Sequence, residues 1–234
     1  MRIVFKEDGN LHVFNLNKTS NKKICADPKE KIVQTYVFSR EQFEHVLTGT
    51  KDLSGFYSKA NSNCLDCPMR EYGKCYTHKY MQTAGFYSML RSVGKEFPCW
   101  EQVPEMSSGM LSKIVAMATS KYVRFGTYGE PVLHGWMLVK SITLVAKNWT
   151  GYTHQWRDYP HFAEFFMASV HSHEIEAVAR GEGWRSFASL KSPSVELVNC
   201  PASKEGGFRT SCDKCGLCSG QGGKGSKSIY ILEH

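Results

Sequence analysis

Two groups of closely spaced cysteines constrain this chain more than any other feature of its sequence. They are Cys64, Cys67 and Cys75 in the first third and Cys200, Cys212, Cys215 and Cys218 near the C-terminus. Two cysteines separated by two residues close a loop too short for a disulfide to stabilise much, but they present two thiolates on one turn. Because the first residues lack the apolar core of a secretory signal, we expect a reducing compartment, the cytoplasm. The spacing therefore predicts metal ligands.

The C-terminal group predicts an iron–sulfur centre in preference to a zinc site. Bacterial ferredoxins hold cubane clusters with a Cys-x-x-Cys-x-x-Cys run, and a remote Cys-Pro completes the coordination. Here the run extends from Cys212 to Cys218, and Cys200 precedes Pro201. Zinc more often takes two separate Cys-x-x-Cys turns, so three cysteines in series favour iron. A structural zinc ion that closes the C-terminus is the alternative.

The first group supplies three ligands rather than four. A 4Fe-4S cluster held by three cysteines leaves one iron open to a substrate or cofactor, which is typical of chemistry rather than of a structural role. The alternative is a closed site completed by Cys25, Cys99 or His78. Buried free thiols are common in cores, so Cys25 and Cys99 are otherwise expected to be ordinary packed residues.

Charge and apolar content set looser limits. The 234 residues carry a formal net charge of +7, which suits contact with a nucleic acid but equally an ordinary basic enzyme. No stretch approaches the roughly 18–20 apolar residues that cross a bilayer, so we expect no membrane partner. Nothing in the sequence indicates an oligomeric state.

The spacing of apolar residues predicts a mixed α/β chain. Strands are expected over residues 2–5, 11–15, 32–38, 122–127, 149–154, 164–170, 184–190, 195–198 and 229–232. Helices are expected after Ser39, which has Gln42 at the capping-box position, and over residues 76–93, 107–120, 134–147 and 174–180. Residues 49–75 are rich in Gly, Ser, Asn and Cys and predict an irregular, ligand-bearing loop.

Strands that alternate with helices predict parallel pairing with right-handed crossovers. We expect a single domain over residues 1–234, a partial (β/α) barrel or an open, mostly parallel sheet with cysteine-rich metal-binding loops at both ends. Residues 1–100 would carry the first cysteine group, 107–199 the β/α core, and 200–234 the C-terminal group and last strand. Ligands of such folds bind at the carboxyl ends of the strands. The loops there are expected at residues 126–131, 154–157 and 171–173.

The segment from Tyr122 to Pro131, Tyr-Val-Arg-Phe-Gly-Thr-Tyr-Gly-Glu-Pro, resembles radical S-adenosylmethionine enzymes. In that family a Gly-Gly-Glu-Pro-like turn after the second barrel strand binds the amino group of the cofactor. The resemblance implies that Gly126, Gly129 and Glu130 bind S-adenosylmethionine beside a 4Fe-4S cluster. The family's cysteine loop is Cys-x-x-x-Cys-x-x-Cys, which differs from the spacing of the first group here. An ordinary strand-to-helix turn accounts for Gly-Glu-Pro as well.

Several segments together resemble an uncharacterised cysteine-rich family from bacteriophage and plasmid genomes. The segments are residues 64–70 with 75–76, 124–131, 150–156, 183–187, 200–202 and 212–218. This resemblance covers most of the chain from about residue 32. It implies iron–sulfur chemistry in an infected bacterial host and a substrate from nucleotide or DNA-base modification.

Several polar residues near predicted strand ends are candidates for chemistry. His154 suits a general base, a metal ligand or a donor to substrate, or else a structural histidine, and Arg157 is expected to contact substrate. Trp184 and Arg185 suit stacking on a nucleobase, with a buried Trp as the alternative. His171 and His173 alternate along the chain, so they cannot easily share one metal ion.

The leading interpretation is an iron–sulfur enzyme of phage type with one or two 4Fe-4S clusters, S-adenosylmethionine and an external reductant. Its catalytic residues would be Glu130, His154 and Arg157, and its substrate a small molecule or nucleic acid. The alternative is a non-catalytic zinc or iron–sulfur protein that binds nucleic acid. An inhibitor of a host enzyme has no positive sign in the sequence.

Overall fold

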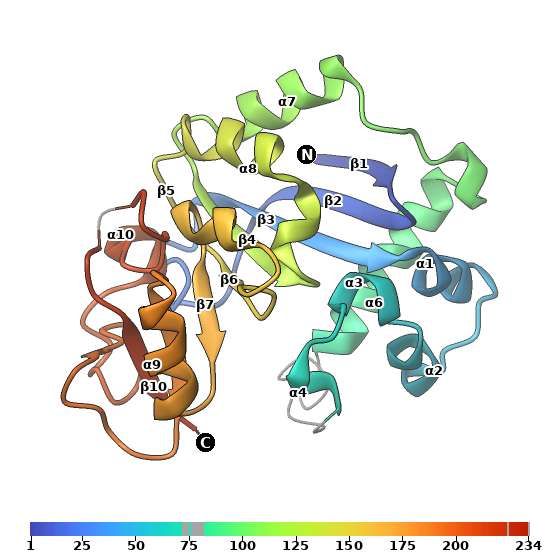
Figure 1. Cartoon of the computed structure of the whole chain (residues 1–234). Helices are drawn as coiled ribbons and strands as arrows, with labels where there is room; N and C mark the ends of the chain where they lie inside the picture. The colour runs from blue at the N-terminus through green and yellow to red at the C-terminus, as the bar shows by residue number, and fades with distance from the viewer. Residues whose placement is uncertain (72–74, 76–81, 224, 234) are drawn as a thin grey trace.

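The computed structural model describes residues 1–71, 75, 82–223 and 225–233 (Figure 1). The strands are β1 (Arg2–Glu7), β2 (Asn10–Lys18), β3 (Lys31–Ser39), β4 (Tyr122–Tyr128), β5 (Asn148–Thr150), β6 (Tyr152–Thr153), β7 (Met167–Val170), β8 (Ser186–Leu190), β9 (Val198–Asn199) and β10 (Ile229–Leu232). The helices are α1 (Arg40–Leu47), α2 (Leu53–Ser58), α3 (Asn61–Cys64), α4 (Pro68–Glu71), α6 (Gln82–Glu96), α7 (Ser108–Ala118), α8 (Trp136–Thr143), α9 (His173–Gly181) and α10 (Cys212–Cys215). Short 3₁₀ turns are η1 (Trp100–Gln102), η2 (Pro131–His134) and η3 (Pro160–Glu164).

The described strands form two five-stranded sheets that are joined through Gly151. The first has the order β1-β2-β3-β4-β5, antiparallel from β1 to β3 and parallel from β3 to β5. The second has the order β6-β7-β8-β10-β9 and is parallel throughout. Only Gly151 separates β5 from β6, so the parallel run passes from one sheet to the other (Figure 1). The parallel pairing predicted for the segments of β4 to β8 is confirmed, and the described strands do not close into a barrel.

The first sheet lies between two helical layers, each with its own apolar core. On one face, side chains such as Val13, Phe38 and Tyr36 pack with α1, α2 and α6. On the other face, Phe14, Val33 and other buried residues pack with α7 and α8. Alternate residues of β2 and β3 therefore enter different cores, as the two-residue period of a strand requires.

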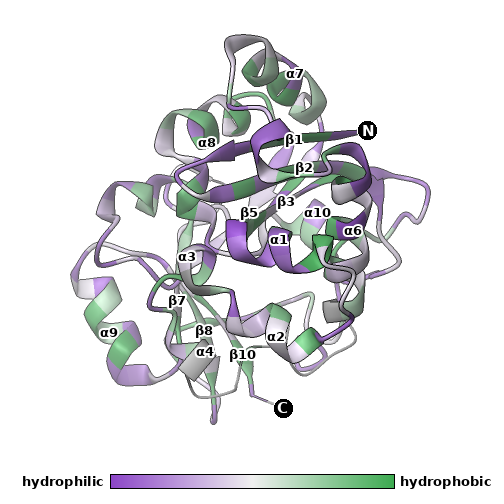
Figure 2. Cartoon of the chain, turned by 90° about the vertical axis from the view of Figure 1, so that its right-hand side faces the viewer, coloured by the Kyte–Doolittle hydropathy of each residue, from purple (hydrophilic) through white to green (hydrophobic). Residues whose placement is uncertain are grey.

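The second sheet is covered by α9 and by the C-terminal segment. In Figure 2 the hydropathy colouring is green along much of β7 and β10, with β8 between them. Arg185 holds the C-terminal segment in place: its guanidinium donates to the carbonyl oxygens of Leu217, Gly220 and Lys227. The final strand, β10, has the bounds that its apolar pattern predicts.

Local signals account for most helix boundaries. Ser39 caps α1 in a reciprocal capping box with Gln42, as predicted. The prediction of an irregular segment over residues 49–75 was wrong in part, because Asp52 accepts a hydrogen bond from Ser54 N and begins α2, and the buried Phe56 anchors that helix. The predicted helix over 134–147 is shorter, since Gly135 at φ +78° separates η2 from α8. The first residues of the predicted helix over 76–93 lie outside the described residues. No helix in the described part of the chain combines the length and apolarity needed to cross a membrane.

Candidate functional site

Both cysteine groups line a single cavity of about 600 Å³. The seven cysteines predicted as metal ligands all contribute to its wall: Cys64, Cys67, Cys75, Cys200, Cys212, Cys215 and Cys218. So do Gly126, Gly129, Glu130 and His154, the residues expected at strand ends. The prediction placed the cysteine loops at two ends of the fold, whereas the structure brings segments from both halves of the chain to one space. Their metal binding stays a prediction.

The turn after β4 is shaped by the close approach of other backbone segments. Gly129 has φ +75°, and a Cβ there would lie 2.5 Å from the carbonyl oxygen of Val37. Its neighbour Glu130 donates its backbone N–H to the carbonyl oxygen of Asn63, at 2.9 Å. Asn63 in turn donates its side-chain amide to Val37 O, also at 2.9 Å. The turn therefore fixes the residue before Cys64 against β3.

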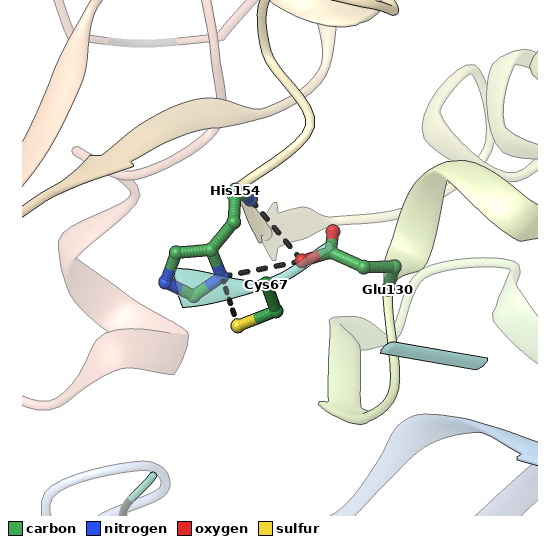
Figure 3. Close-up of side chains that lie close together, drawn as sticks. All are labelled: Cys67, Glu130 and His154. Carbon is green, nitrogen blue, oxygen red and sulfur yellow. Dashed lines mark hydrogen bonds and ion pairs between the residues drawn. The ribbon is translucent and has the colours of Figure 1, made fainter. Parts of the chain in front are cut away.

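Glu130 is the centre of a buried polar group at the end of β4, and it is 4% exposed. Its Oε2 accepts a hydrogen bond from the hydroxyl of Thr153 at 2.8 Å. Its Oε1 lies 3.2 Å from both the backbone nitrogen and ring Nδ1 of His154. The same Nδ1 lies 3.5 Å from the sulfur of Cys67 (Figure 3). Glu130 thus orients His154 against the first cysteine group.

The protonation of His154 follows from its two acidic neighbours. Burial acts to lower its pKa, but the hydrogen bonds and charges of Cys67 and Glu130 outweigh burial and raise the pKa of His154 to about 10. The ring also stacks on His171, with centroids 5.3 Å apart. Its Nε2 atom is buried and has no hydrogen-bond partner among the described residues. One edge of the ring is therefore engaged by the protein, and the other is left for a further contact.

Two of the three cysteines of the first group lie where one short helix ends and the next begins. Cys64 ends α3, Cys67 immediately precedes α4, and the N–H of Cys67 donates to the carbonyl oxygen of Cys64 at 3.1 Å. This single turn presents both thiols to the cavity. Cys25 and Cys99, considered as fourth ligands, do not line the cavity within the described structure. His78, the remaining candidate, lies outside the described residues.

The C-terminal group is held by backbone hydrogen bonds to three other parts of the chain. Cys200 N donates to Tyr230 O at 2.9 Å, Cys212 N donates to Lys23 O at 2.8 Å, and Cys218 O accepts from Gly151 N at 3.3 Å. Gly216 ends α10 at φ +71°, where a Cβ would lie 2.9 Å from the Asn148 side chain. The cysteine loop therefore passes close to β5.

The thiols of this group are near enough to influence one another. Burial raises the pKa of Cys212 to about 11, and the charge of Cys200 adds to the effect. Burial also raises the pKa of Cys218 strongly; a hydrogen bond with Tyr152 opposes this, while Cys200, Cys212 and Cys215 add to it. Several buried thiolates together would repel one another unless a cation balances them.

Arg157 and the Trp184–Arg185 pair lie elsewhere. Arg157 is exposed, with its guanidinium carbon 4.0 Å from the Trp156 ring centroid, and it is not part of the cavity wall that the structure describes. Its contact with substrate stays a prediction. Trp184 and Arg185 are 3% and 8% exposed, and Arg185 is bonded to backbone carbonyls, so neither is presented for stacking on a nucleobase. His171 lines the cavity, whereas His173 is exposed and begins α9. The expected alternation of the two along an extended segment was wrong, because β7 ends at Val170.

A buried histidine pair beneath the β4 turn was not predicted from the sequence. His12 Nδ1 and His134 Nδ1 lie 3.0 Å apart, and His134 Nε2 lies 2.9 Å from Thr35 Oγ1. The hydroxyl oxygen of Thr35 also accepts the N–H of Gly126 at 3.1 Å. Burial lowers the pKa of His12 to about 4, and burial together with the charge of His12 lowers that of His134 well below its usual range. Through Thr35, this neutral pair holds the backbone of Gly126, where the turn that carries Glu130 begins.

Two sets of three ligand-type side chains are compact among the described residues. One ligand atom from each member lies within 4.8 Å of the others in Cys67–Glu130–His154 and in Cys25–Glu30–Asp213. The four C-terminal sulfur atoms, all described, are not grouped within this spacing. The first compact set belongs to the cavity. The second was not predicted, because Asp213 is distant in the sequence from Cys25 and Glu30.

Comparison of the chain with family models, with curated proteins and with solved structures gives no match. The function is therefore argued from the site.

Proposed function

We propose that this chain is an iron–sulfur enzyme of the radical S-adenosylmethionine type that acts on a nucleotide or a DNA base. The observation that carries the proposal is the shared cavity. Seven cysteines, the β4 turn with Gly126, Gly129 and Glu130, and His154 all line one space of about 600 Å³, within the range of about 300–1,000 Å³ typical of small-molecule sites. A metal site with a purely structural role at the C-terminus would not need to face a second cysteine group.

The number of thiols in the C-terminal group supports a closed cluster. Cys200, Cys212, Cys215 and Cys218 all contribute to the cavity wall, and a cubane cluster takes four cysteine thiolates. In the proposal these residues hold an auxiliary cluster.

The β4 turn supports the binding of an ammonium group. The carboxylate of Glu130 has about four acceptor positions, and three hydrogen bonds reach it from Thr153 and His154. One position remains for an ammonium. Cys64, Cys67 and Cys75 would hold the reactive cluster. The single Nδ1–H of His154, shared between Glu130 Oε1 and the Cys67 sulfur, would act on that cluster through Cys67. Hydrogen bonds of this kind tune the reduction potential of a cluster.

The bound cluster and cofactor would supply a hydrogen-abstracting radical. With an external one-electron reductant the cofactor would end as methionine and 5′-deoxyadenosine, the added hydrogen atom coming from substrate. Cys64, Cys67 and Cys75 would hold the cluster, and Glu130 would hold the ammonium of the cofactor. The protein's own contribution is to position both molecules and exclude water. His154 Nε2, which is buried without a partner in the described structure, is the ring atom that remains to contact substrate.

The cavity wall supports a substrate with phosphate and a flat ring. Lys23 and Arg124 are basic residues of the wall, and the chain has a net charge of +7. Tyr152 and Phe187, with ring centroids 4.5 Å apart, provide aromatic surface in the same wall. Basic groups with aromatic rings are the usual combination for binding an unpaired nucleotide.

The test is product analysis on anaerobically purified, chemically reduced protein. With S-adenosylmethionine added, wild type should release methionine and 5′-deoxyadenosine in equal amounts. Cys67→Ala should abolish release while iron bound by the C-terminal group persists, and Glu130→Gln should raise the cofactor concentration needed. Cys99→Ala, at a thiol outside the cavity, is the matched control and should behave as wild type. Iron-loaded wild type that releases neither product would refute the proposal.

A second candidate function is a non-catalytic metal protein that binds nucleic acid. The compact set of Cys67, Glu130 and His154 is the observation that favours it, because a thiolate, an imidazole and a carboxylate at that spacing suit a single zinc ion. Zinc at this set, with no iron at either cysteine group, would establish this candidate in place of the first.

A further inference from the structure

Cys25, Glu30 and Asp213 form a compact set of ligand-type side chains outside the cavity. The sulfur of Cys25 and one carboxylate oxygen each from Glu30 and Asp213 all lie within 4.8 Å of one another. Cys25 is 1% exposed and Asp213 is 4% exposed, while Glu30 lies partly open to solvent. Two of the three ligand-type side chains are therefore buried, and the third reaches the surface.

The backbone fixes the two buried members. The loop between β2 and β3 carries Cys25, and α10 carries Asp213 (Figure 1). Asp213 N donates to Ile24 O at 3.0 Å, and the neighbouring Cys212 N donates to Lys23 O. Cys25 N donates in turn to Asn21 O at 3.1 Å. The two side chains converge because their main chains are bonded to each other, so the geometry is built into the fold.

One oxygen of the Asp213 carboxylate is not satisfied by the described residues. Its Oδ1 atom is buried and accepts no hydrogen bond from the described residues. No ion pair between described residues gives Asp213 or Glu30 a basic partner. A buried carboxylate without a partner is costly, by several kcal/mol per ion in real proteins. Two carboxylates and a thiol that meet here without a basic side chain of the described residues therefore point to a bound cation.

We propose that Cys25, Glu30 and Asp213 bind a zinc ion. A thiolate with two carboxylates combines a soft and two hard ligands, which suits zinc better than calcium or magnesium, because those ions take oxygen ligands. Three protein ligands leave a fourth position for water. Binding involves no redox change: the Cys25 thiol gives up its proton to solvent as the sulfur–zinc bond forms.

The ion would brace the wall of the cavity. Its ligands join the β2–β3 loop to α10, and these segments also supply Lys23, Ile24, Cys212 and Cys215 to the cavity wall. Zinc at this position therefore stabilises the C-terminal cysteine loop from outside. The inference does not depend on the proposed enzymatic activity, since none of the three ligands is one of the seven cysteines assigned to the clusters, although Asp213 lies between Cys212 and Cys215 in the sequence.

The test is zinc binding by the full chain, with zinc alone as the probe. Protein is prepared anaerobically, dialysed against dilute zinc, and analysed for zinc per chain; affinity is then measured by competition with a chromophoric chelator. Asp213→Asn and Glu30→Gln should each remove one zinc ion per chain or weaken its binding by more than about 100-fold, beyond the 10–100-fold loss typical when a residue that only hydrogen-bonds to a ligand is changed. Asp27→Asn is the matched control, because Asp27 is in the same loop but accepts the N–H of Lys29. That variant should keep the zinc.

Cobalt substitution gives a readout specific to the thiolate. The sulfur-to-cobalt charge-transfer band contributed by this site should disappear in Cys25→Ser, and the carboxylate variants should weaken it. Glu30 is partly exposed, so Glu30→Gln tests the inference even if a substitution at a buried ligand prevents folding. Equal zinc content and affinity in wild type, Asp213→Asn and Glu30→Gln would overturn the proposal.

Discussion

Lowering the pH from 7 to 5 is expected to destabilise the protein through the buried pair of His12 and His134. His12 is 1% exposed and stacks on Phe5, with ring centroids 4.7 Å apart. Its pKa is about 4 in the folded protein, against about 6.5 in an unfolded chain. Between these values the unfolded state binds a proton that the folded state does not. The contribution of neutral His12 to the free energy of unfolding is therefore fully present above about pH 6.5 and is lost as the pH falls toward 4.

The two pKa values give the size of the effect. Between pH 7 and pH 5, proton binding to the unfolded state lowers the free energy of unfolding by about 2 kcal/mol for His12 alone. His134 adds to the loss in the same direction, because its pKa is also lowered. Protonation of both rings would also break the contact between the two Nδ1 atoms and loosen Thr35, which accepts the N–H of Gly126.

The assay is urea unfolding of wild type and His12→Asn at several pH values. The Asn side chain places an amide near the former Nδ1 and does not titrate. Between pH 7 and pH 5 the free energy of unfolding of His12→Asn should therefore fall by about 2 kcal/mol less than that of wild type. Any acid loss of metal from the cysteines is common to both proteins and cancels in the difference. His161→Asn, at an exposed histidine, should keep the wild-type slope. Equal pH slopes for wild type and His12→Asn would refute the reasoning.

Three further predictions each compare a substitution with a control substitution. Gly129→Ala and Gly135→Ala both place Ala at positive φ, which costs about 1–2 kcal/mol of stability each. Only the Cβ at position 129 would meet Val37 O, at 2.5 Å, so unfolding should show about 1–3 kcal/mol more destabilisation for Gly129→Ala. Equal losses in the two variants would contradict the close approach. Cys215→Ala should give insoluble or molten protein, because metal binding to such a site contributes on the order of 10 kcal/mol to folding. Cys99→Ala is the control and should stay soluble. A soluble, fully metallated Cys215→Ala variant would disprove this prediction. Arg185→Met should destabilise by about 3 kcal/mol through three carbonyls left without a donor, whereas Arg209→Met, at an exposed arginine, should change unfolding by less than about 1 kcal/mol.

The elements that the sequence predicted well are those with local signals. The Ser39 capping box, the Ser107 cap of α7 and the apolar run of β10 each depend on residues a few positions apart. The parallel order of β4 to β8 followed from alternation of strands and helices. The helix α2 was missed because its stability comes from Phe56 packing against Phe38 and Tyr87, which are distant in the sequence.

The candidate site shows the same division between features that have a local sequence signal and features that depend on the fold. Spacing selected the seven cysteines, and the family resemblance of the Tyr122–Pro131 segment selected Glu130, but neither gave a sign that both cysteine groups share one cavity. That convergence depends on the backbone bonds from Cys212 to Lys23 and from Cys200 to Tyr230. His12 and His134, which are 122 positions apart, and the set of Cys25, Glu30 and Asp213 likewise exist only in the folded chain. Arg185 looked available for stacking because its carbonyl partners come from a segment 32 to 42 residues later.

The central claim is that the two cysteine groups hold iron–sulfur clusters around one cavity and that the first cluster is open to a ligand. Electron paramagnetic resonance of the anaerobically purified, reduced protein tests this most directly, with and without S-adenosylmethionine. The account predicts signals from two clusters, one of which shifts on addition of the cofactor and is missing in Cys67→Ala, while the other persists. A protein that contains zinc and no iron, or cluster signals that S-adenosylmethionine leaves unchanged, would contradict it.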